Sequence, residues 1–598
     1  MKKLPLFTIF FILLGCAYFM KTSTWKGNNW KTTIDGYDTK AYYSYLPEFF
    51  VNHNLIITDS TLPYVNVINK QIFNKHFVGP AVLWSPFFLA TLEYARLQHK
   101  DSDMYSALFV KGIGIAALFW LFIGLYCLWG ILKFFNISDP VISLTLFLIV
   151  FGTNLFYYVF NQYMMAHMYS FSMLSVFLYT GMKYSRTEKK QYLVLMSMAF
   201  GLSVIIRPTS ICVLPCLLPL MCGDIKKTMR TFFTPVSLFI AISIIVPILF
   251  LQCGTWYMQT GHWFVRAYSS EGFYFLHPQI FNVLLSFQNG WFVYTPLALI
   301  SLFGLVNLYQ INKVSFYSCF LAIIVWLYLV SCWWCWSYED GFEHRAFIDI
   351  YALVAIGMAH LFPSAKNKIY AFASPLKKKI ISGNLLLGCG LFLTVSLIQT
   401  YQYCNNIMFS YWMDWDCYKY VFLKTSDKYI DCLGGFRDLP PYTIKPTQLV
   451  ISSKLNFTQG QGWRFKDPER LNGKPAIHFE GDDFGTVLDI PSDSVYNKGE
   501  RYYAIITLTR FEPEGNSSSG VLFVSDVTGA DNKNEYYKSF KINDYPSGKD
   551  SNTRTYQYEL DTPGLIHKDS KMRFYIWNKD RQNFYLTGLS IEIYRCFP

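Results

Sequence analysis

The sequence predicts a polytopic α-helical membrane domain followed by an all-β sandwich. Of its 598 residues, 52% are hydrophobic and only 15% are charged. The apolar residues gather in blocks of roughly 17 to 25, the length of a helix that crosses a bilayer. After about residue 440, the pattern changes to the short alternating runs that are typical of strands. The chain therefore reads as a membrane protein with a soluble tail.

The N-terminus predicts a first membrane helix. Lys2 and Lys3 precede an apolar run over residues 4–20, and basic residues in front of such a run favour a cytoplasmic N-terminus. A signal peptide has the same pattern, and Leu13-Leu14-Gly15-Cys16 resembles a lipoprotein cleavage site. A helix anchored by Lys2 and Lys3 explains the same residues more simply.

Ten further apolar blocks follow, so that the sequence predicts about eleven membrane spans. These blocks cover residues 106–132, 141–160, 166–182, 192–206, 209–222, 232–252, 291–310, 315–332, 346–362 and 381–401.

The distribution of basic residues predicts the topology. When the spans alternate from a cytoplasmic N-terminus, the basic clusters at 183–190, 226–227, 313 and 377–379 all face the cytoplasm, as the positive-inside rule requires. Residues 21–105, 253–290 and everything after about 402 then lie outside. The formal net charge of +12 is explained by these loops, so we expect no nucleic-acid partner.

The predicted domains are a transmembrane domain over 1–402 with a large first outer loop at 21–105, a linker over 403–440, and a β-sandwich over 441–598. Alternating runs at 502–509, 521–525, 572–577 and 584–594, separated by Gly, Asn, Asp and Pro, indicate the strands. The last of them resemble the closing strands of carbohydrate-binding jelly-roll modules. Such sandwiches also serve as structural or protein-contact domains.

The first outer loop combines acidic and aromatic residues. Asp35 and Asp38 lie about fifteen residues beyond the first span, close to Tyr42 and Tyr43. A carboxylate there can accept a proton from an acceptor hydroxyl or stabilise positive charge at a sugar carbon, and aromatic rings can stack on sugars. Alternatively, Asp35 caps a helix that begins near Tyr37, and the tyrosines form an interfacial belt.

Three short motifs carry a family resemblance. They are Asn74-Lys75-His76-Phe77-Val78-Gly79-Pro80-Ala81, Asn289-Gly290-Trp291-Phe292-Val293-Tyr294-Thr295-Pro296, and Trp333-Trp334-Cys335-Trp336 through Gly341-Phe342-Glu343-His344-Arg345-Ala346-Phe347-Ile348-Asp349. With an acidic first outer loop, many spans and a soluble C-terminal domain, residues 1 to about 400 resemble the polytopic GT-C glycosyltransferases. The resemblance is to the bacterial branch akin to protein O-mannosyltransferases and the lipid A aminoarabinose transferase.

The resemblance implies an inverting transferase of the bacterial inner membrane, with its C-terminal domain in the periplasm. Such an enzyme moves a sugar from a polyprenyl-phosphate carrier to a lipid, glycan or protein acceptor on the outer face. The family's base lies in the first outer loop, which matches Asp35 here, with Asp38 as the second candidate. Many relatives carry adjacent acidic residues at this place, whereas Gly36 follows Asp35 here; of the two candidates, we expect Asp35 to be the base.

The donor phosphate needs cations. Lys75 matches the basic residue that precedes the Gly-Pro run in relatives, while Arg207 and Arg345 fall near expected outer helix ends. Arginine binds phosphate in a bidentate manner and lysine acts as a point charge. An arginine at a helix end can also simply snorkel to the headgroups.

Further polar or aromatic residues collect on the expected outer side and are candidates for substrate binding. They are Tyr42, Tyr43, His76, His167, His262, Arg266, Glu339 and His344. Some relatives use a divalent metal, but no tight ligand cluster indicates one here, so metal dependence stays open. The spacing of Cys332 and Cys335 resembles that of thioredoxin, but these residues follow a membrane helix, and we expect no redox role.

Two other classes of protein share part of this pattern. A transporter or lipid flippase would also have about eleven spans, but it usually shows internal repeats and polar residues at mid-bilayer, and neither is clear here. A non-enzymatic envelope-assembly protein could use the β domain as its working part. It would not need acidic and basic residues from several outer loops.

Overall fold

The computed structural model divides the chain into two compact units. One comprises Met1–Asn405 with Phe409–Trp415, and the other Asn406–Met408 with Asp416–Pro598. The structure describes residues 3–22, 30–58, 62, 64–68, 71–99, 103–268, 272–338, 341–362, 374–409, 413, 415–426, 429, 448–457, 462–481, 484–491, 501–513, 521–528, 534–542, 552–560, 571–579 and 581–596.

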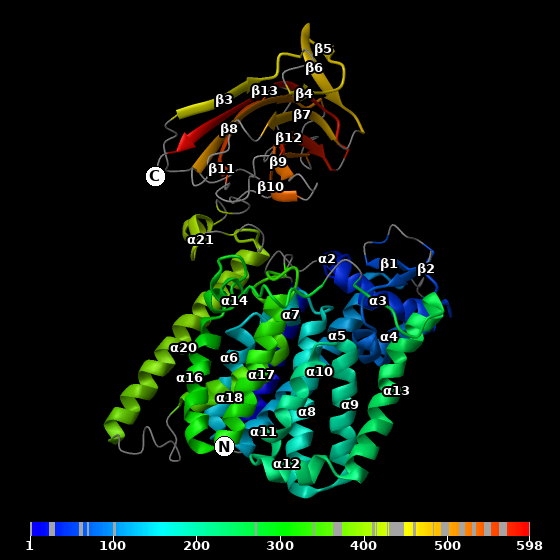
Figure 1. Cartoon of the computed structure of the whole chain (residues 1–598), viewed down its shortest axis with the longest axis vertical. Coiled ribbons are helices and arrows are strands. Elements are labelled where there is room, and N and C mark those ends of the chain that lie inside the picture. The colour runs from blue at the N-terminus through cyan, green and yellow to red at the C-terminus, as the bar shows by residue number, and fades with distance from the viewer. Residues whose placement is uncertain are drawn as a thin grey trace. The chain divides into compact units, whose positions relative to one another are not determined.

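The first unit is built from helices and one small β hairpin (Figure 1). Its helices are α1 (Leu4–Thr22), α2 (Trp30–Ile34), α3 (Tyr37–Phe50), α4 (Gly79–Leu97), α5 (Ala107–Phe134), α6 (Asp139–Phe151), α7 (Leu155–Phe160), α8 (Ala166–Thr187), α9 (Lys190–Ile206), α10 (Ser210–Val213), η1 (Leu214–Leu217), α11 (Leu218–Cys222), α12 (Ile225–Phe232), α13 (Pro235–Thr260), α14 (Ile280–Leu285), α15 (Trp291–Tyr294), α16 (Pro296–Ile311), α17 (Lys313–Cys332), η2 (Arg345–Ile350), α18 (Tyr351–Leu361) and α20 (Pro375–Cys404). The short helix α21 (Trp415–Val421) lies at the boundary between the units.

Five helices among the described residues are long and apolar enough to cross a membrane, which makes this a multi-pass membrane protein. They are α1, α5, α13, α17 and residues 379–404 of α20. The predicted number of eleven is not confirmed. Four more apolar segments, 139–151, 190–206, 210–222 and 296–311, have at most 17 residues and span at most about 25 Å, less than a bilayer's hydrocarbon core. The block predicted at 166–182 lies in α8, which is buried among other helices.

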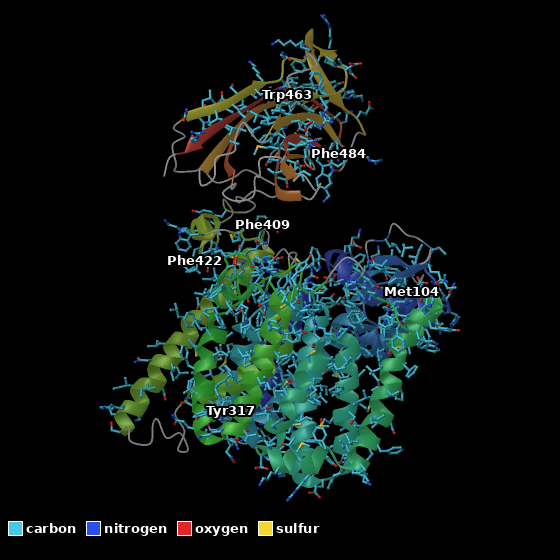
Figure 2. All side chains as sticks on the ribbon, viewed as in Figure 1. Met104, Tyr317, Phe409, Phe422, Trp463 and Phe484 are labelled. Carbon is cyan, nitrogen blue, oxygen red and sulfur yellow. The ribbon has the colours of Figure 1, made fainter. Side chains whose placement is uncertain are left out.

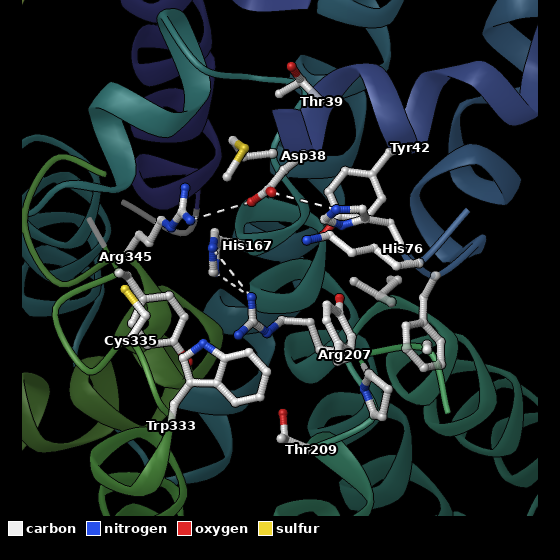
Figure 3. A pocket seen from close by; sticks show the side chains of 18 of the residues that line it. Asp38, Thr39, Tyr42, His76, His167, Arg207, Thr209, Trp333, Cys335 and Arg345 are labelled. Carbon is white, nitrogen blue, oxygen red and sulfur yellow. Dashed lines mark hydrogen bonds and ion pairs between the residues drawn. The ribbon is translucent and has the colours of Figure 1, made fainter. Parts of the chain in front are cut away.

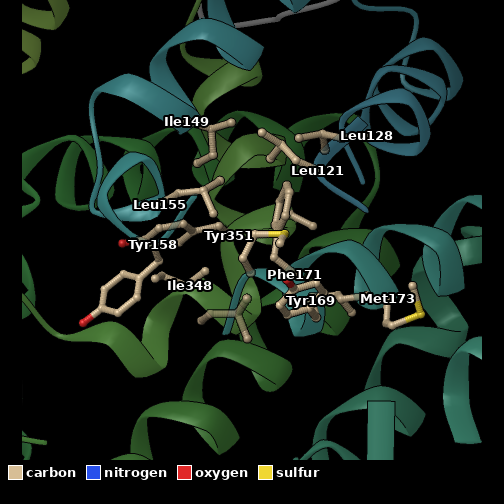
Figure 4. Packing of buried hydrophobic residues seen from close by; sticks show 14 of the residues in the cluster. Leu121, Leu128, Ile149, Leu155, Tyr158, Tyr169, Phe171, Met173, Ile348 and Tyr351 are labelled. Carbon is tan, nitrogen blue, oxygen red and sulfur yellow. The ribbon is translucent and has the colours of Figure 1, made fainter. Parts of the chain in front are cut away.

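A continuous apolar core fills the helical unit. Figure 4 shows part of it, and Figure 2 shows the side chains over the whole ribbon. The core residues labelled in Figure 4 are Leu121, Leu128, Ile149, Leu155, Tyr158, Tyr169, Phe171, Met173, Ile348 and Tyr351. Because lipid is as apolar as these side chains, close packing rather than exclusion of water holds membrane helices together. At one crossing, a Cβ on Gly304 of α16 would overlap the carbonyl of Gly357 of α18, so only glycine allows this approach.

The segment predicted as the first outer loop is folded. Helices α2 and α3 come first, then an antiparallel hairpin of β1 (Val65–Ile68) and β2 (Gln71–Asn74), then α4. Helix α3 begins at Tyr37, as expected, but its N-cap is Gly36 and no side chain caps it. The alternative role of Asp35 as a helix cap is therefore wrong.

The second unit contains two antiparallel sheets. Its strands are β3 (Gln448–Lys454), β4 (Trp463–Arg464), β5 (Glu469–Leu471), β6 (Lys474–Phe479), β7 (Phe484–Pro491), β8 (Arg501–Phe511), β9 (Val521–Thr528), β10 (Asn534–Lys541), β11 (Asn552–Leu560), β12 (Lys571–Asn578) and β13 (Phe584–Cys596). One sheet has the order β10-β9-β12-β7-β4, and the other has the order β11-β8-β13-β6-β5, with β3 also paired to β13.

Both sheets bury alternate residues in one shared core, which makes the unit a β-sandwich. On β12, Met572, Phe574 and Ile576 are buried, while the residues between them are partly exposed. Trp463 of β4, labelled in Figure 2, joins the same core, and its indole Nε1 donates to Ser453 Oγ at 2.8 Å. The period of two in the sequence thus matches the side chains that face inward.

Candidate active site

A cavity of about 860 Å³ lies at one end of the helical unit. Its walls come from segments far apart in sequence: the start of α3, the end of the β hairpin, the start of α8, the end of α9, the segment after α13 and the segment after α17. Figure 3 shows charged side chains from these segments turned toward one another across the cavity.

Asp38 is the acidic centre of this cavity. One of its carboxylate oxygens, Oδ2, lies 3.4 Å from a terminal nitrogen of Arg345, and Oδ1 lies 3.7 Å from His76 Nε2 (Figure 3). The Asp38 side chain is 30% exposed, so solvent or a substrate can reach it. Burial by itself would raise the pKa of this carboxyl, but Arg345, His76 and the other nearby cations outweigh burial and hold the pKa below its ordinary value.

Asn74 at the end of β2 fixes the hairpin against α3. Its buried amide Nδ2 donates to the carbonyl of Ala41 at 2.8 Å, and its Oδ1 accepts from the backbone N–H of His76 at 2.9 Å. These two bonds join the helix that carries Asp38 to the segment that carries Lys75 and His76. The first motif therefore brings an acid and two basic residues into one place.

Gly79 in the same motif allows α4 to start directly against the end of α9. A Cβ at this position would overlap the backbone of Ile205 and Ile206. Residues 205 and 206 immediately precede Arg207, which lines the cavity. The glycine thus brings the Lys75 segment and Arg207 close together.

Asp349 of η2 binds two of the cavity's basic residues. Its Oδ2 lies 2.8 Å from Arg207 Nε, and its Oδ1 lies 2.9 Å from His167 Nδ1. The side chains of Asp349 and His167 are 3% and 2% exposed, whereas that of Arg207 is 17% exposed and lines the cavity. Because its Nε is held by Asp349, the Arg207 guanidinium has a fixed direction.

The second motif supports the segment that carries Arg345. The Trp291 ring stacks on Phe347 with centroids 3.8 Å apart, and the Asn289 amide donates to the carbonyl of Ser337 at 3.0 Å. In addition, Thr295 Oγ1 donates to Glu343 at 2.6 Å. These contacts show that the second motif packs against the third, which carries Arg345.

One wall of the cavity is aromatic. Trp333 lies 4.9 Å from Phe273 and 5.7 Å from Tyr268 between ring centroids, and the Lys75 ammonium lies 6.0 Å from the centre of the Tyr268 ring. Flat aromatic faces beside charged groups suit a ligand with an apolar sugar face and an anionic group.

The structure brings most of the candidate residues together, but not all of them. Asp38, Tyr42, Lys75, His76, His167, Arg207, Arg266 and Arg345 line the cavity. Four others lie outside its lining, and Glu339 falls outside the described residues. Asp35 and His262 are exposed, Tyr43 is buried with its hydroxyl bonded to the carbonyl of Met104, and His344 is buried with Nε2 donating to the carbonyl of Trp336 at 2.9 Å.

Two features of the cavity were not assigned roles from the sequence. Asp349 holds Arg207 and His167, and the signal for it was an acidic residue inside an apolar block, which usually has a function. Trp333 belongs to a motif, but only its neighbours 60 to 65 residues earlier, Tyr268 and Phe273, reveal the aromatic wall.

Among the described residues, no group of three or more His, Cys, Asp or Glu side chains could hold a metal ion. Cys332 is a free thiol. The cavity therefore presents a carboxylate, several cations and aromatic rings as its chemical groups.

No protein-family model matches the chain, and no curated protein matches its sequence. Among solved structures, the chain is similar to the arabinosyltransferase EmbB from Mycobacterium smegmatis, with 10% sequence identity and a TM-score of 0.34. The match covers 99% of this chain and 64% of the EmbB chain, so this chain spans less than two thirds of that length. With so low a TM-score, the assignment of the cavity depends on its own residues.

Proposed function

We propose that the protein is a membrane glycosyltransferase. It transfers a sugar from a polyprenyl-phosphate-linked donor to a lipid, glycan or protein acceptor of the cell envelope, on the periplasmic face of a bacterial inner membrane. The observation that carries this proposal is the partly exposed carboxylate of Asp38, set among cations and aromatic rings in a cavity at the end of membrane helices. The C-terminal sandwich is periplasmic in this proposal.

Asp38 is the general base. Its lowered pKa keeps it ionised at neutral pH, and its exposed fraction leaves room for an acceptor hydroxyl. Asp35 is a poorer candidate because it is exposed and does not line the cavity.

Lys75, Arg207 and Arg345 bind the donor phosphate. Two of them are already held in place by carboxylates: Arg345 by Asp38 and Arg207 by Asp349. Cations that are fixed before the reaction stabilise the developing charge on a leaving phosphate without a cost of reorganisation.

The reaction is a single displacement with inversion. The acceptor oxygen forms a bond to the anomeric carbon while its proton passes to Asp38. The bond between that carbon and the phosphate oxygen breaks, and the electron pair leaves on the polyprenyl phosphate. The aromatic wall of Trp333 and Tyr268 stacks against the sugar ring and orients it for this attack.

Binding of the donor also tunes the base. A phosphate anion beside Arg345 neutralises the cation that contributes most to the lowered pKa of Asp38. The pKa of Asp38 therefore rises when the donor binds, so the carboxylate becomes a stronger base in the complex that reacts.

The test compares cells that carry the wild-type protein, Asp38→Asn, Asp35→Asn or no protein, by mass spectrometry of lipid-linked sugars and envelope glycans. We expect the deletion and Asp38→Asn to accumulate the same polyprenyl-phosphate sugar and to lack the same glycan, since loss of a general base costs about a hundredfold or more. Asp35→Asn should behave as the wild type.

The opposite result would identify a different site. If Asp38→Asn, at wild-type abundance, supported normal glycans while the deletion did not, the proposed base would be wrong. If the deletion changed no lipid-linked sugar, the proposal of a glycosyltransferase would fail, and a transport assay would be the next experiment.

A further inference from the structure

The helical unit contains a second cavity, of about 560 Å³, at its other end. It is lined by the ends of α5, α8, α11 and α16, the starts of α6 and α17, and the end of α18. Helix α8 connects the two cavities, because His167 near its start lines the first and Arg186 near its end lines the second. At 1.5 Å per residue, these two positions are about 30 Å apart, close to the thickness of the bilayer's hydrocarbon core.

The charges on this cavity are positive. Arg186 and Lys227 line it, and its lining contains no acidic side chain among the described residues. The Arg186 guanidinium is held over the Phe134 ring, 4.0 Å from the ring centre, and this ring also lines the cavity. Two acidic residues near the cavity already have partners. Asp139 at the start of α6 lies 2.6 Å from Lys133 Nζ, and Asp224, the N-cap of α12, accepts from the backbone N–H of Lys227 at 2.6 Å.

A buried histidine faces the same cavity. His360 is 3% exposed, and its Nδ1 donates to the carbonyl of Ile356 at 2.7 Å. Its Nε2 is buried, and no described residue bonds to it. A buried ring nitrogen that makes no hydrogen bond costs stability, so this atom is suited to a ligand in the cavity.

The start of α6 also lines the cavity, and the acidic residue of its first turn, Asp139, is paired with Lys133. Ser138 is the N-cap of this 13-residue helix and lines the cavity. Its side chain accepts no hydrogen bond from the N–H groups of the first turn. The first-turn N–H groups of a helix carry partial positive charge and favour an anion.

We propose that this second cavity binds a phosphate-bearing anion, either the headgroup of an anionic lipid or free phosphate. Phosphate matches both kinds of group in the cavity, since its ionised oxygens pair with Arg186 and Lys227. It also suits His360, because Nε2 can accept from a protonated phosphate oxygen or, once protonated, donate to an ionised one. The proposed function does not require this site, so each proposal can fail without the other.

The experiment measures the thermal unfolding midpoint of the full chain in phosphatidylcholine nanodiscs. In one arm, inorganic phosphate is titrated against chloride at equal ionic strength. In the other, phosphatidylglycerol replaces part of the phosphatidylcholine, and native mass spectrometry counts the retained lipids. We expect the midpoint to rise in at least one arm, and that arm identifies the source of the phosphate group.

Adjacent lysines on α12 give a matched pair of variants. Lys227 lines the cavity and Lys226 does not, although both are exposed. Lys227→Ala and Arg186→Ala should each raise about tenfold the ligand concentration that is needed for a given rise of the midpoint. This is the effect of one lost charge-assisted hydrogen bond. Lys226→Ala should respond as the wild type does. His360→Asn, which keeps a donor for the carbonyl of Ile356 but lacks Nε2, should also weaken the response.

Two results would overturn the proposal. One is the absence of a rise in both arms. The other is an equal rise in Lys227→Ala and Lys226→Ala, because the anions would then act on the basic surface as a whole rather than in the cavity.

Discussion

The two cavities of the helical unit differ in how their cations are paired. In the first, Arg345 lies against Asp38 and Arg207 against Asp349. In the second, Arg186 and Lys227 have no acidic neighbour in the described lining. Carboxylates that pair with cations fix directions and tune proton affinity, which a reaction needs, whereas unpaired cations only attract an anion. The contrast supports the two proposals, a reaction in the first cavity and the binding of an anion in the second.

The strongest test of this contrast removes a paired cation from the first cavity. Arg345→Gln should lower kcat for sugar transfer by about a hundredfold or more, since one preorganised contact to the leaving phosphate is lost. The measurement is transfer with purified protein and a polyprenyl-phosphate donor. Arg266→Gln removes an exposed cation from the same cavity and should cost less than tenfold. Equal losses in the two variants would mean that pairing has no role.

Removing the partner carboxylate should have the next largest effect. Asp349→Asn leaves Arg207 without its counter-charge, and breaking such a buried pair costs about 3–5 kcal/mol of folding free energy. The KM for the donor should rise more than kcat falls, because Arg207 loses its fixed direction while Asp38 stays in place. Asp349→Glu should restore part of both the stability and the KM. A variant with a normal KM and lower stability would show that Asp349 has only a structural role.

Gly79→Ala tests whether the first cavity depends on backbone packing. The added Cβ overlaps the backbone of Ile205 and Ile206, and such overpacking costs about 1–3 kcal/mol. The thermal midpoint should fall, and transfer should fall with it because Arg207 follows directly. Gly254→Ala on α13 is the control, since a Cβ there meets nothing within 4 Å. If both variants unfolded at the same temperature, the close approach at Gly79 would be unimportant.

The smallest effect concerns pH. Transfer needs ionised Asp38, so activity is full above its pKa and is lost as the pH falls through it. The acid limb of the pH profile of kcat/KM reports the pKa of Asp38 in the free enzyme, where the nearby cations lower it. The acid limb of kcat reports the pKa in the complex with the donor, where the phosphate neutralises those cations. We expect the kcat limb at the higher pH. Coincident limbs would contradict the proposed effect of donor binding on the base.

The sequence predicted both the membrane helices and the β strands, because long apolar blocks mark the helices and alternation of apolar and polar residues marks the strands. Apolar blocks marked α1, α5, α13, α17 and α20, and alternating residues marked strands such as β12. The number of spans was less predictable. Gly152 ends α6, so the predicted block over 141–160 becomes a shorter helix. Pro215 and Pro219 divide the block over 209–222, which is already shorter than a full span, into short helical pieces. The fold within residues 30–97 depends on long-range contacts that no local pattern encodes.

For the site, the motifs identified the right segments but not the directions of the side chains. Asp35 and Asp38 are both acidic residues of the same loop in the sequence, yet Asp35 is exposed in the turn before α3, whereas Asp38 lies in the first turn of α3 and lines the cavity. Tyr42 and Tyr43 are also adjacent, and successive helical residues are about 100° apart, so one lines the cavity and the other packs inside. Local composition cannot distinguish such neighbours, because the packing of the other helices decides which face is open.

Helix α8 fixes the distance between the two cavities. Its two ends carry groups of the two cavities, and it is buried along most of its course, so it cannot easily tilt or stretch by itself. A bilayer much thinner or thicker than about 30 Å would move one cavity away from its membrane surface. For the proposed transferase, the chain length of the surrounding lipids would then affect the reaction, and activity should pass through an optimum when acyl chains are lengthened step by step.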